Sequence, residues 1–208
     1  MKESNEDSKK KIGGFKLNAT YFLISLCLAV FLIEMFYEFV GHKALETMFY
    51  TLGFSLDNLL AGKWWTIITS IFMHANPEHL VLNMIALFFF GIVVENELGW
   101  KKTILIFFAS AALGNVAVLF ANLIGIMPSA IPTIGASAAV FGLLGTAMLV
   151  KPLEFMFFPF IVPVPLLLVS LIYIFINVAE FVVVLTSGGV TDVAYAAHIG
   201  GLLSGMMF

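Results

Sequence analysis

Hydrophobic residues along this chain fall into long runs that are separated by short polar segments. Several of these runs have about the 20 apolar residues that a helix needs to cross the hydrocarbon core of a bilayer. The pattern predicts six membrane helices, at about residues 17–40, 78–94, 101–126, 137–150, 166–185 and 192–208. The last is barely long enough to span.

Residues 41–78 do not continue this pattern, because their apolar clusters are too short to span and alternate with charged residues. Trp64 and Trp65 are of the type that lies at headgroup level. We therefore predict an interfacial or partly embedded loop between the first two helices. Residues 1–17 are polar and lysine-rich, so we expect a tail there and one membrane domain over 18–208.

Composition supports a membrane protein and narrows its chemistry. Hydrophobic residues make up 61% of the 208 residues and charged residues 11%, whereas soluble domains carry about 25% charged residues. The net charge of −3 argues against a nucleic-acid partner. A single cysteine, Cys27, excludes an intramolecular disulfide and a cysteine zinc site. We expect no cofactor.

The lysines predict the orientation in the membrane, since cytoplasmic loops are enriched in Lys and Arg. All ten basic residues are lysines. With six helices and a cytoplasmic N-terminus, two lysines (43 and 63) lie outside and eight lie inside (2, 9, 10, 11, 16, 101, 102 and 151). We therefore expect both termini in the cytoplasm. The short tails are typical of a multi-pass protein of a prokaryotic cell membrane.

Ser137 stands out at the start of an apolar helix, because it follows the small residues Gly135 and Ala136. Ser137, Phe141 and Gly145 share one stripe of that helix at four-residue spacing. Glycine at such a position lets a neighbouring helix come close. The residues alone leave open that Ser137 is an N-cap or a helix-packing residue.

Two other helices carry polar groups that are costly in a membrane. His79 and Asn83 are four residues apart and share a face; a capping or helix-to-helix hydrogen-bonding role is the alternative. His198 is followed by Gly201 and Gly205, a Gly-x-x-x-Gly face for close helix packing. A buried structural histidine remains the alternative there.

The metal alternative is weak. His74 and His79 are five residues apart and do not form the His-Glu-x-x-His pair of metalloproteases. We predict no metal site. Among the acids, we expect Glu34 at the membrane interface and Glu95 in solvent, and we assign no role to Glu180.

Together, the three polar sites suggest nucleophilic catalysis. His79, Ser137 and His198 each lie in the first turns of helices that would run in the same direction, so they would lie at similar depth. A serine hydroxyl needs a base to become nucleophilic, and histidine is the usual one. His79, Asn83 and the backbone N–H groups at the helix start could stabilise an oxyanion.

These residues resemble the rhomboid family of intramembrane serine proteases. The nucleophile motif Gly-x-Ser-x appears as Gly135 to Ala138, the His-x-x-x-Asn motif as His79 to Asn83, and the base motif as Ala197 to Gly205. The three motifs come in the right order and span roughly residues 60–205.

The resemblance implies an all-α, six-helix bundle with a partly embedded first loop and a mobile fifth helix or cap loop that admits substrate. It also implies a catalytic dyad of Ser137 and His198 without an acid, and an oxyanion site that includes His79, Asn83 and the segment of Gly135 and Ala136. Phe141, Gly145, Gly201 and Gly205 would support the packing.

Two positions depart from the family. A Trp-Arg pair often precedes the second helix, where this chain has Trp65 and Thr66, so we expect the loop to lack its usual ionic anchor. The aromatic residue after the nucleophile is Phe141 rather than the frequent Tyr. It can pack on the imidazole but donates no hydrogen bond.

The leading hypothesis is a serine endopeptidase that cleaves transmembrane segments of other membrane proteins near the outer side of the bilayer. A non-catalytic rhomboid-like protein that binds membrane clients is the first alternative. A small transporter, with Glu180, His198 and Asn83 along its path, is the second. Against transport, the chain shows no inverted repeat.

Overall fold

The structure is a computed structural model that describes residues 11–12, 15–16, 18–156, 163–187 and 194–208. Helices dominate the described residues. They are α1 (Ala19–Val40), α2 (His42–Leu52), α3 (Leu56–Leu60), α4 (Thr66–Thr69), the 3₁₀ helix η1 (Ser70–Phe72), α5 (Pro77–Leu98), α6 (Trp100–Leu123), α7 (Ser137–Val150), α8 (Leu166–Ser187) and α9 (Tyr195–Gly205). Two short antiparallel pairs accompany them: β1 (Lys11–Ile12) with β2 (Phe15–Lys16), and β3 (Phe155–Met156) with β4 (Val164–Pro165).

The long helices lie where the hydrophobic runs predict them. Four helices, α1, α5, α6 and α8, are long and apolar enough to cross a membrane, so the chain is a membrane protein. Helix α7 has the predicted bounds, 137–150. Helix α9 is shorter than the predicted 192–208, and the predicted start at residue 192 lies outside the described residues, as does most of the 1–17 tail.

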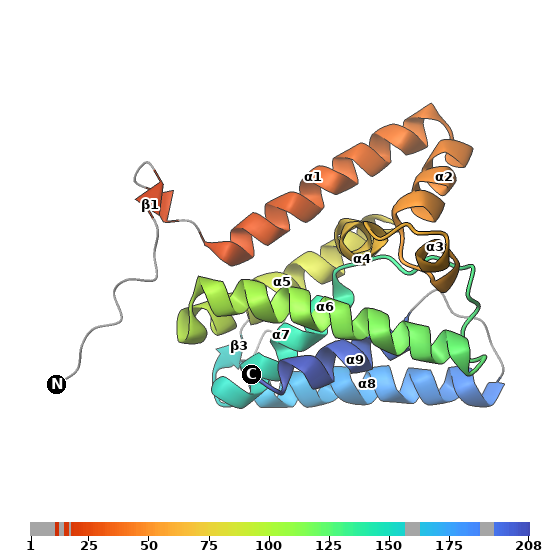
Figure 1. The fold of residues 1–208 in the computed structure, drawn as a ribbon. Helices are drawn as coiled ribbons and strands as arrows, with labels where there is room; N and C mark the ends of the chain where they lie inside the picture. Colours follow the sequence, from red (N-terminus) through yellow and green to blue (C-terminus); the bar gives the residue numbers. More distant parts are fainter. Residues whose placement is uncertain (1–10, 13–14, 17, 157–162, 188–193) are drawn as a thin grey trace.

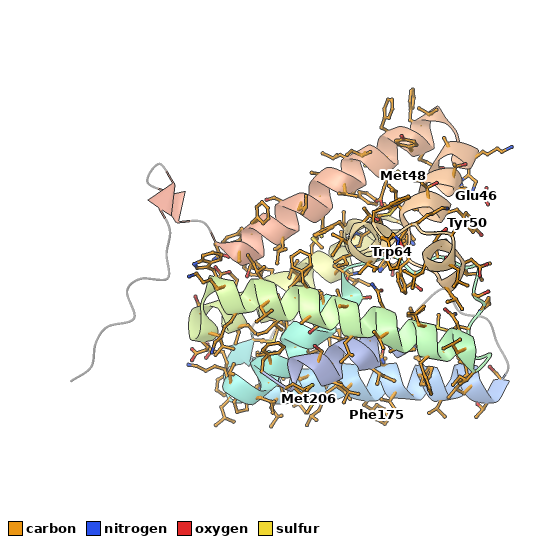
Figure 2. All side chains as sticks on the ribbon, in the orientation of Figure 1. Glu46, Met48, Tyr50, Trp64, Phe175 and Met206 are labelled. Carbon is orange, nitrogen blue, oxygen red and sulfur yellow. The ribbon has the colours of Figure 1, made fainter. Side chains whose placement is uncertain are left out.

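Helix α7 lies at the centre of the bundle, in contact with α5, α6, α8 and α9 (Figure 1). Most of its residues are buried, from Ala138 to Met148. The outer helices instead present apolar side chains outward, as Phe175 on α8 and Met206 after α9 do at the edge of the bundle (Figure 2). Large apolar side chains thus cover the outside of the bundle, where a soluble protein has more polar ones, and such a surface suits a lipid environment.

Glycine allows α7 and α9 to touch through their backbones. A Cβ atom added to Gly201 would collide with the carbonyl of Ala138, and one added to Gly205 would collide with the carbonyl of Gly142. Thr146 closes the same contact by donating to the Gly205 carbonyl at 2.7 Å. Helix association in lipid depends on such close packing.

Two carboxylates anchor α1, and both correct the sequence-based expectations. Glu95 on α5 is not free in solvent. It accepts from the backbone N–H of Ala19 and of Thr20 at 2.9 Å, and from the Thr20 hydroxyl at 2.8 Å. It thereby satisfies N–H groups that the first turn of α1 leaves without a partner.

Glu34 is buried rather than interfacial, at 2% exposure. Its carboxylate accepts from the backbone N–H of His74 at 3.1 Å, which ties the segment before α5 to the C-terminal half of α1. Burial of a carboxylate is costly unless it has such partners. Glu180, by contrast, is exposed on α8.

The segment 41–76 folds into α2, α3, α4 and η1. Helix α2 follows the end of α1 directly, and α3 lies beside α2 (Figure 1). Lys63 donates to the side-chain oxygen of Asn58 at 2.8 Å, and Asn58 donates to the carbonyl of Gly53 at 2.8 Å. Trp65 donates to Thr51, and Thr69 to Leu52. Hydrogen bonds from lysine, amide, indole and hydroxyl groups therefore hold this segment together. Thr66 is buried and donates to the Lys63 carbonyl.

We predict that Gly205→Val destabilises the protein by about 3 kcal/mol or more, because overpacking costs roughly 1–3 kcal/mol and the obstacle here is backbone. The measurement is the thermal unfolding midpoint in detergent micelles. Leu203→Val, on the exposed side of the same helix, is the matched control. Equal midpoints for the two variants would show that the α7–α9 contact is not tight.

Candidate active site

Ser137 is the first residue of α7 and follows a loop in which Gly135 has a positive φ. Ala136 occupies the N-cap position and makes no side-chain cap, so the Ser137 hydroxyl does not cap the helix. Instead it lies 2.8 Å from Nε2 of His198. The two side chains, 61 residues apart in sequence, meet within hydrogen-bonding distance.

His198 lies in the first turn of α9 and is held by the ring of Phe141. The two rings are stacked, with centroids 4.5 Å apart and planes inclined by 10°. Phe141 lies one turn after Ser137 on α7, so the same helix carries the hydroxyl and the ring that supports its partner. The close α7–α9 packing at Gly201 brings these two helix starts together.

His79 approaches the same place from α5. Asn76 caps this helix by accepting from the His79 N–H at 2.8 Å. The Nδ1 atom of His79 accepts from the N–H of Ala75 at 3.4 Å. In a neutral imidazole the proton is then on Nε2, and a Cβ added to Gly135 would lie 2.8 Å from that atom.

Gly135 is required at this point for two reasons. Its φ of +123° is one that residues with a side chain rarely adopt, and a side chain would collide with His79. Its N–H donates to the Ser70 carbonyl at 2.9 Å, which attaches the loop to η1. His79 therefore lies against the backbone just before Ser137.

Asn83 is one turn after His79 and is buried, at 6% exposure. Its Nδ2 atom donates to the His79 carbonyl at 2.9 Å. A carboxamide nitrogen carries two hydrogens, so one remains for another acceptor. Asn83 and His79 thus offer two side-chain donors on the face of α5 that points toward Ser137.

A cavity of about 420 Å³ joins these groups. Ser137, His198, His79 and Asn83 are among its polar lining residues. Apolar side chains of α5, of α7 and of the loop at 127–134 line much of the remainder, and Tyr173 lines it from α8. Its lining continues along α5 to Phe90. A nucleophile with a base and nearby donors, beside an apolar channel, is suited to acyl transfer on an apolar peptide.

His74 lies beside the site, with its ring centroid 5.1 Å from that of His79. Burial lowers the pKa of His74 to about 4, so its imidazole is neutral near pH 7. Its Nδ1 lies 3.2 Å from the Phe72 carbonyl, to which it can donate. His74 therefore packs under His79 without adding a positive charge.

Asn177 is a further polar residue at the site and was not among the predicted site residues. Its Oδ1 lies 2.6 Å from Nδ1 of His198, and the side chain is buried on α8. The sequence feature that could have identified it is a lone carboxamide within the apolar run 171–179. Polar groups in such runs usually face the bundle interior. Glu180, three residues later, was considered as a polar residue of this helix, but its side chain is exposed.

The chain was compared with known protein families. The family model named Rhomboid domain matches residues 61–208. The chain belongs to the rhomboid family. This membership agrees with the three motifs, at His79, Ser137 and His198, from which the resemblance was drawn.

Individual rhomboid relatives support the membership. The chain is 30% identical over 159 residues to "RHOMBOID-like protein 12, mitochondrial" of Arabidopsis thaliana, covering 71% of this chain and 46% of that protein. It is 27% identical over 187 residues to "Rhomboid protease GluP" of Bacillus subtilis, covering 89% of this chain and 33% of that protein. "Inactive RHOMBOID-like protein 8" of Arabidopsis thaliana is 36% identical over 85 residues, covering 40% of this chain and 22% of that protein. The chain therefore spans between about a fifth and a half of these relatives.

We predict that Gly135→Ala slows the reaction of Ser137 with a fluorophosphonate probe at least about tenfold, because the new methyl group displaces His79 and the backbone is strained. The measurement is the rate of covalent labelling in detergent micelles. Gly125→Ala is the control, since Gly125 also has positive φ (+77°) but open space around its Cβ position. If labelling slowed equally in both variants, backbone strain alone, and not displacement of His79, would explain the lower rate.

Proposed function

We propose that this rhomboid protein is a serine endopeptidase that cleaves transmembrane segments of other membrane proteins. The observation that carries the proposal is the 2.8 Å contact between the Ser137 hydroxyl and Nε2 of His198, at the wall of the cavity. In the proposed mechanism Ser137 Oγ attacks the scissile carbonyl while His198 takes its proton. His198 then returns that proton to the leaving amine as the C–N bond breaks. A water molecule that His198 deprotonates next hydrolyses the acyl-serine ester and regenerates Ser137.

The negative charge that develops on the carbonyl oxygen needs hydrogen-bond donors. We assign this role to Nε2 of His79, to the free amide hydrogen of Asn83 and to the backbone N–H of Ser137. The first N–H groups of a helix have no intrahelical partner, and the helix dipole adds partial positive charge there. The lack of room for a Cβ atom between Gly135 and His79 supports this assignment, because it places His79 beside the residues just before Ser137.

The proposal places the reaction below the membrane surface. Helix α7 has 14 residues, which corresponds to about 21 Å at 1.5 Å per residue, whereas a bilayer core is about 30 Å thick. A helix this short can stay inside the core because other helices surround it. We infer that α7 and α9 complete a bundle of six spans, with the segment 41–76 partly embedded.

The distribution of charge supports one orientation in the membrane. Lys151 at the end of α7 forms an ion pair with Glu97 at the end of α5, at 3.2 Å, so these ends lie together, away from Ser137. We propose that this lysine-bearing side is cytoplasmic, as are both termini, and that the site opens toward the outside of the cell membrane. A substrate helix must unwind locally to expose its carbonyls.

A transporter would need polar residues such as Glu180, together with His198 and Asn83, along the route of its solute. Among the described residues, Glu180 lies on the exposed side of α8 and is not part of the cavity lining. The non-catalytic alternative is raised by a relative whose name describes it as inactive. A fluorophosphonate probe distinguishes it, because covalent labelling that Ser137→Ala abolishes requires an activated serine.

We predict that Ser137→Ala and His198→Ala each abolish cleavage of a fluorescent single-pass substrate in proteoliposomes, because each removes one half of the nucleophile and base pair. Ser204→Ala, a buried serine on α9, and His42→Ala, an exposed histidine, are the matched controls and keep full activity. A Ser137→Ala protein that cleaves at the normal rate would refute the proposed function.

We predict that Asn83→Ala lowers kcat by about 100-fold and leaves KM nearly unchanged, since an oxyanion donor acts mainly in the transition state. The measurement is steady-state cleavage of the same substrate. Asn96→Ala, at the exposed far end of α5, is the control. An unchanged kcat for Asn83→Ala would remove Asn83 from the oxyanion site.

A further inference from the structure

Asn177 is a buried carboxamide on a helix that is mostly apolar. Helix α8 crosses the bundle beside α7 and α9, and Asn177 has 6% exposure on its inner side. An unpaired carboxamide in such a place would cost free energy. Its Oδ1 atom is paired, at 2.6 Å, with Nδ1 of His198.

This contact determines which nitrogen of His198 carries the proton. A carboxamide oxygen only accepts hydrogen bonds, so Nδ1 must be the protonated nitrogen of the neutral ring. Nε2 then presents a lone pair to the Ser137 hydroxyl, 2.8 Å away. This is the form in which a histidine can take the serine proton. The other tautomer would set the lone pairs of Nδ1 and Oδ1 against each other.

The Phe141 ring leaves this choice open. Stacking at 4.5 Å fixes the plane of the imidazole, but a stacked face neither donates to nor accepts from a ring nitrogen. Tyr195 meets the same ring edge-on at 6.1 Å. The Asn177 oxygen supplies the in-plane contact that selects the tautomer and the rotation of the ring.

We propose that Asn177 is a positioning residue that holds His198 in the Nδ1-protonated tautomer and directs its Nε2 at Ser137. This inference rests on the proposed function. Asn177 thus takes the position relative to the histidine that aspartate takes in a Ser-His-Asp triad. A neutral amide fits this apolar interior because it needs no compensation for a buried charge.

The kinetic test compares two substitutions at one position. Asn177→Leu preserves size but removes the acceptor, and we expect kcat to fall about 10- to 100-fold with KM changed less than about twofold. Asn177→Asp keeps an acceptor oxygen, and we expect it to restore most of the lost kcat. Ser170→Ala, which trims another buried polar side chain of α8, is the control and keeps normal activity.

A structural measurement tests the same inference without proteolysis. In ¹⁵N-histidine NMR of the protein in micelles, with His198→Gln used for assignment, we expect the His198 signal of the Nδ1-protonated form. In Asn177→Leu the signal should shift toward a mixture of tautomers or the Nε2-protonated form. The native spectrum alone decides the matter if Asn177→Leu fails to fold.

The outcomes separate the two proposals. An Nε2-protonated His198 in the native protein, or normal kcat in Asn177→Leu, would overturn the role of Asn177 while leaving the Ser137 and His198 assignment intact. An Asn177→Asp variant as slow as Asn177→Leu would also count against it. Full activity of Ser137→Ala would instead refute the proposed function, even with the Nδ1-protonated form observed.

Discussion

The backbone contact between α7 and α9 is the constraint on which the arrangement of this protein depends. In lipid there is little hydrophobic force between helices, so association rests on close packing and interhelical hydrogen bonds. Gly201 and Gly205 let α9 approach the carbonyls of α7, and the Thr146 hydroxyl adds a hydrogen bond across the contact. Residues at the starts of the two helices are thereby held at a fixed separation, and Ser137 and His198 lie at these positions.

Polar groups in this apolar bundle are used as attachments between distant parts of the chain. Glu95 binds the first turn of α1, and Glu34 binds the segment before α5. Each group satisfies backbone or side-chain partners that would otherwise be buried without a hydrogen bond.

Ser137 lies at the boundary between a cavity with polar groups and the apolar core of the bundle. The cavity brings the Ser137 hydroxyl, the imidazoles of His79 and His198 and the carboxamide of Asn83 together, whereas most of α7 is buried. Helix α7 separates the two, since its first residue faces the cavity and its following turns pack into the core. The positive φ of Gly135 is what allows the chain to enter the helix beside His79.

Much of this could be read from the sequence. Hydrophobic run length predicted the long helices and the bounds of α7, and motif spacing predicted the rhomboid family, which the family comparison confirmed. Residue types also singled out Ser137, His79, Asn83 and His198, because polar groups are rare and costly in apolar helices. Periodicity within one helix reveals which residues share a face, and it requires no knowledge of neighbours.

The partners of each polar group were decided only by the tertiary structure. Glu34 and Glu95 were expected at the interface and in solvent, yet both bind backbone N–H groups on other segments. Asn177 was overlooked, although it contacts His198 from a helix 21 residues away in sequence. Helix rotation and crossing determine which side chains meet, and these follow from packing the whole bundle, so local sequence patterns could not specify them.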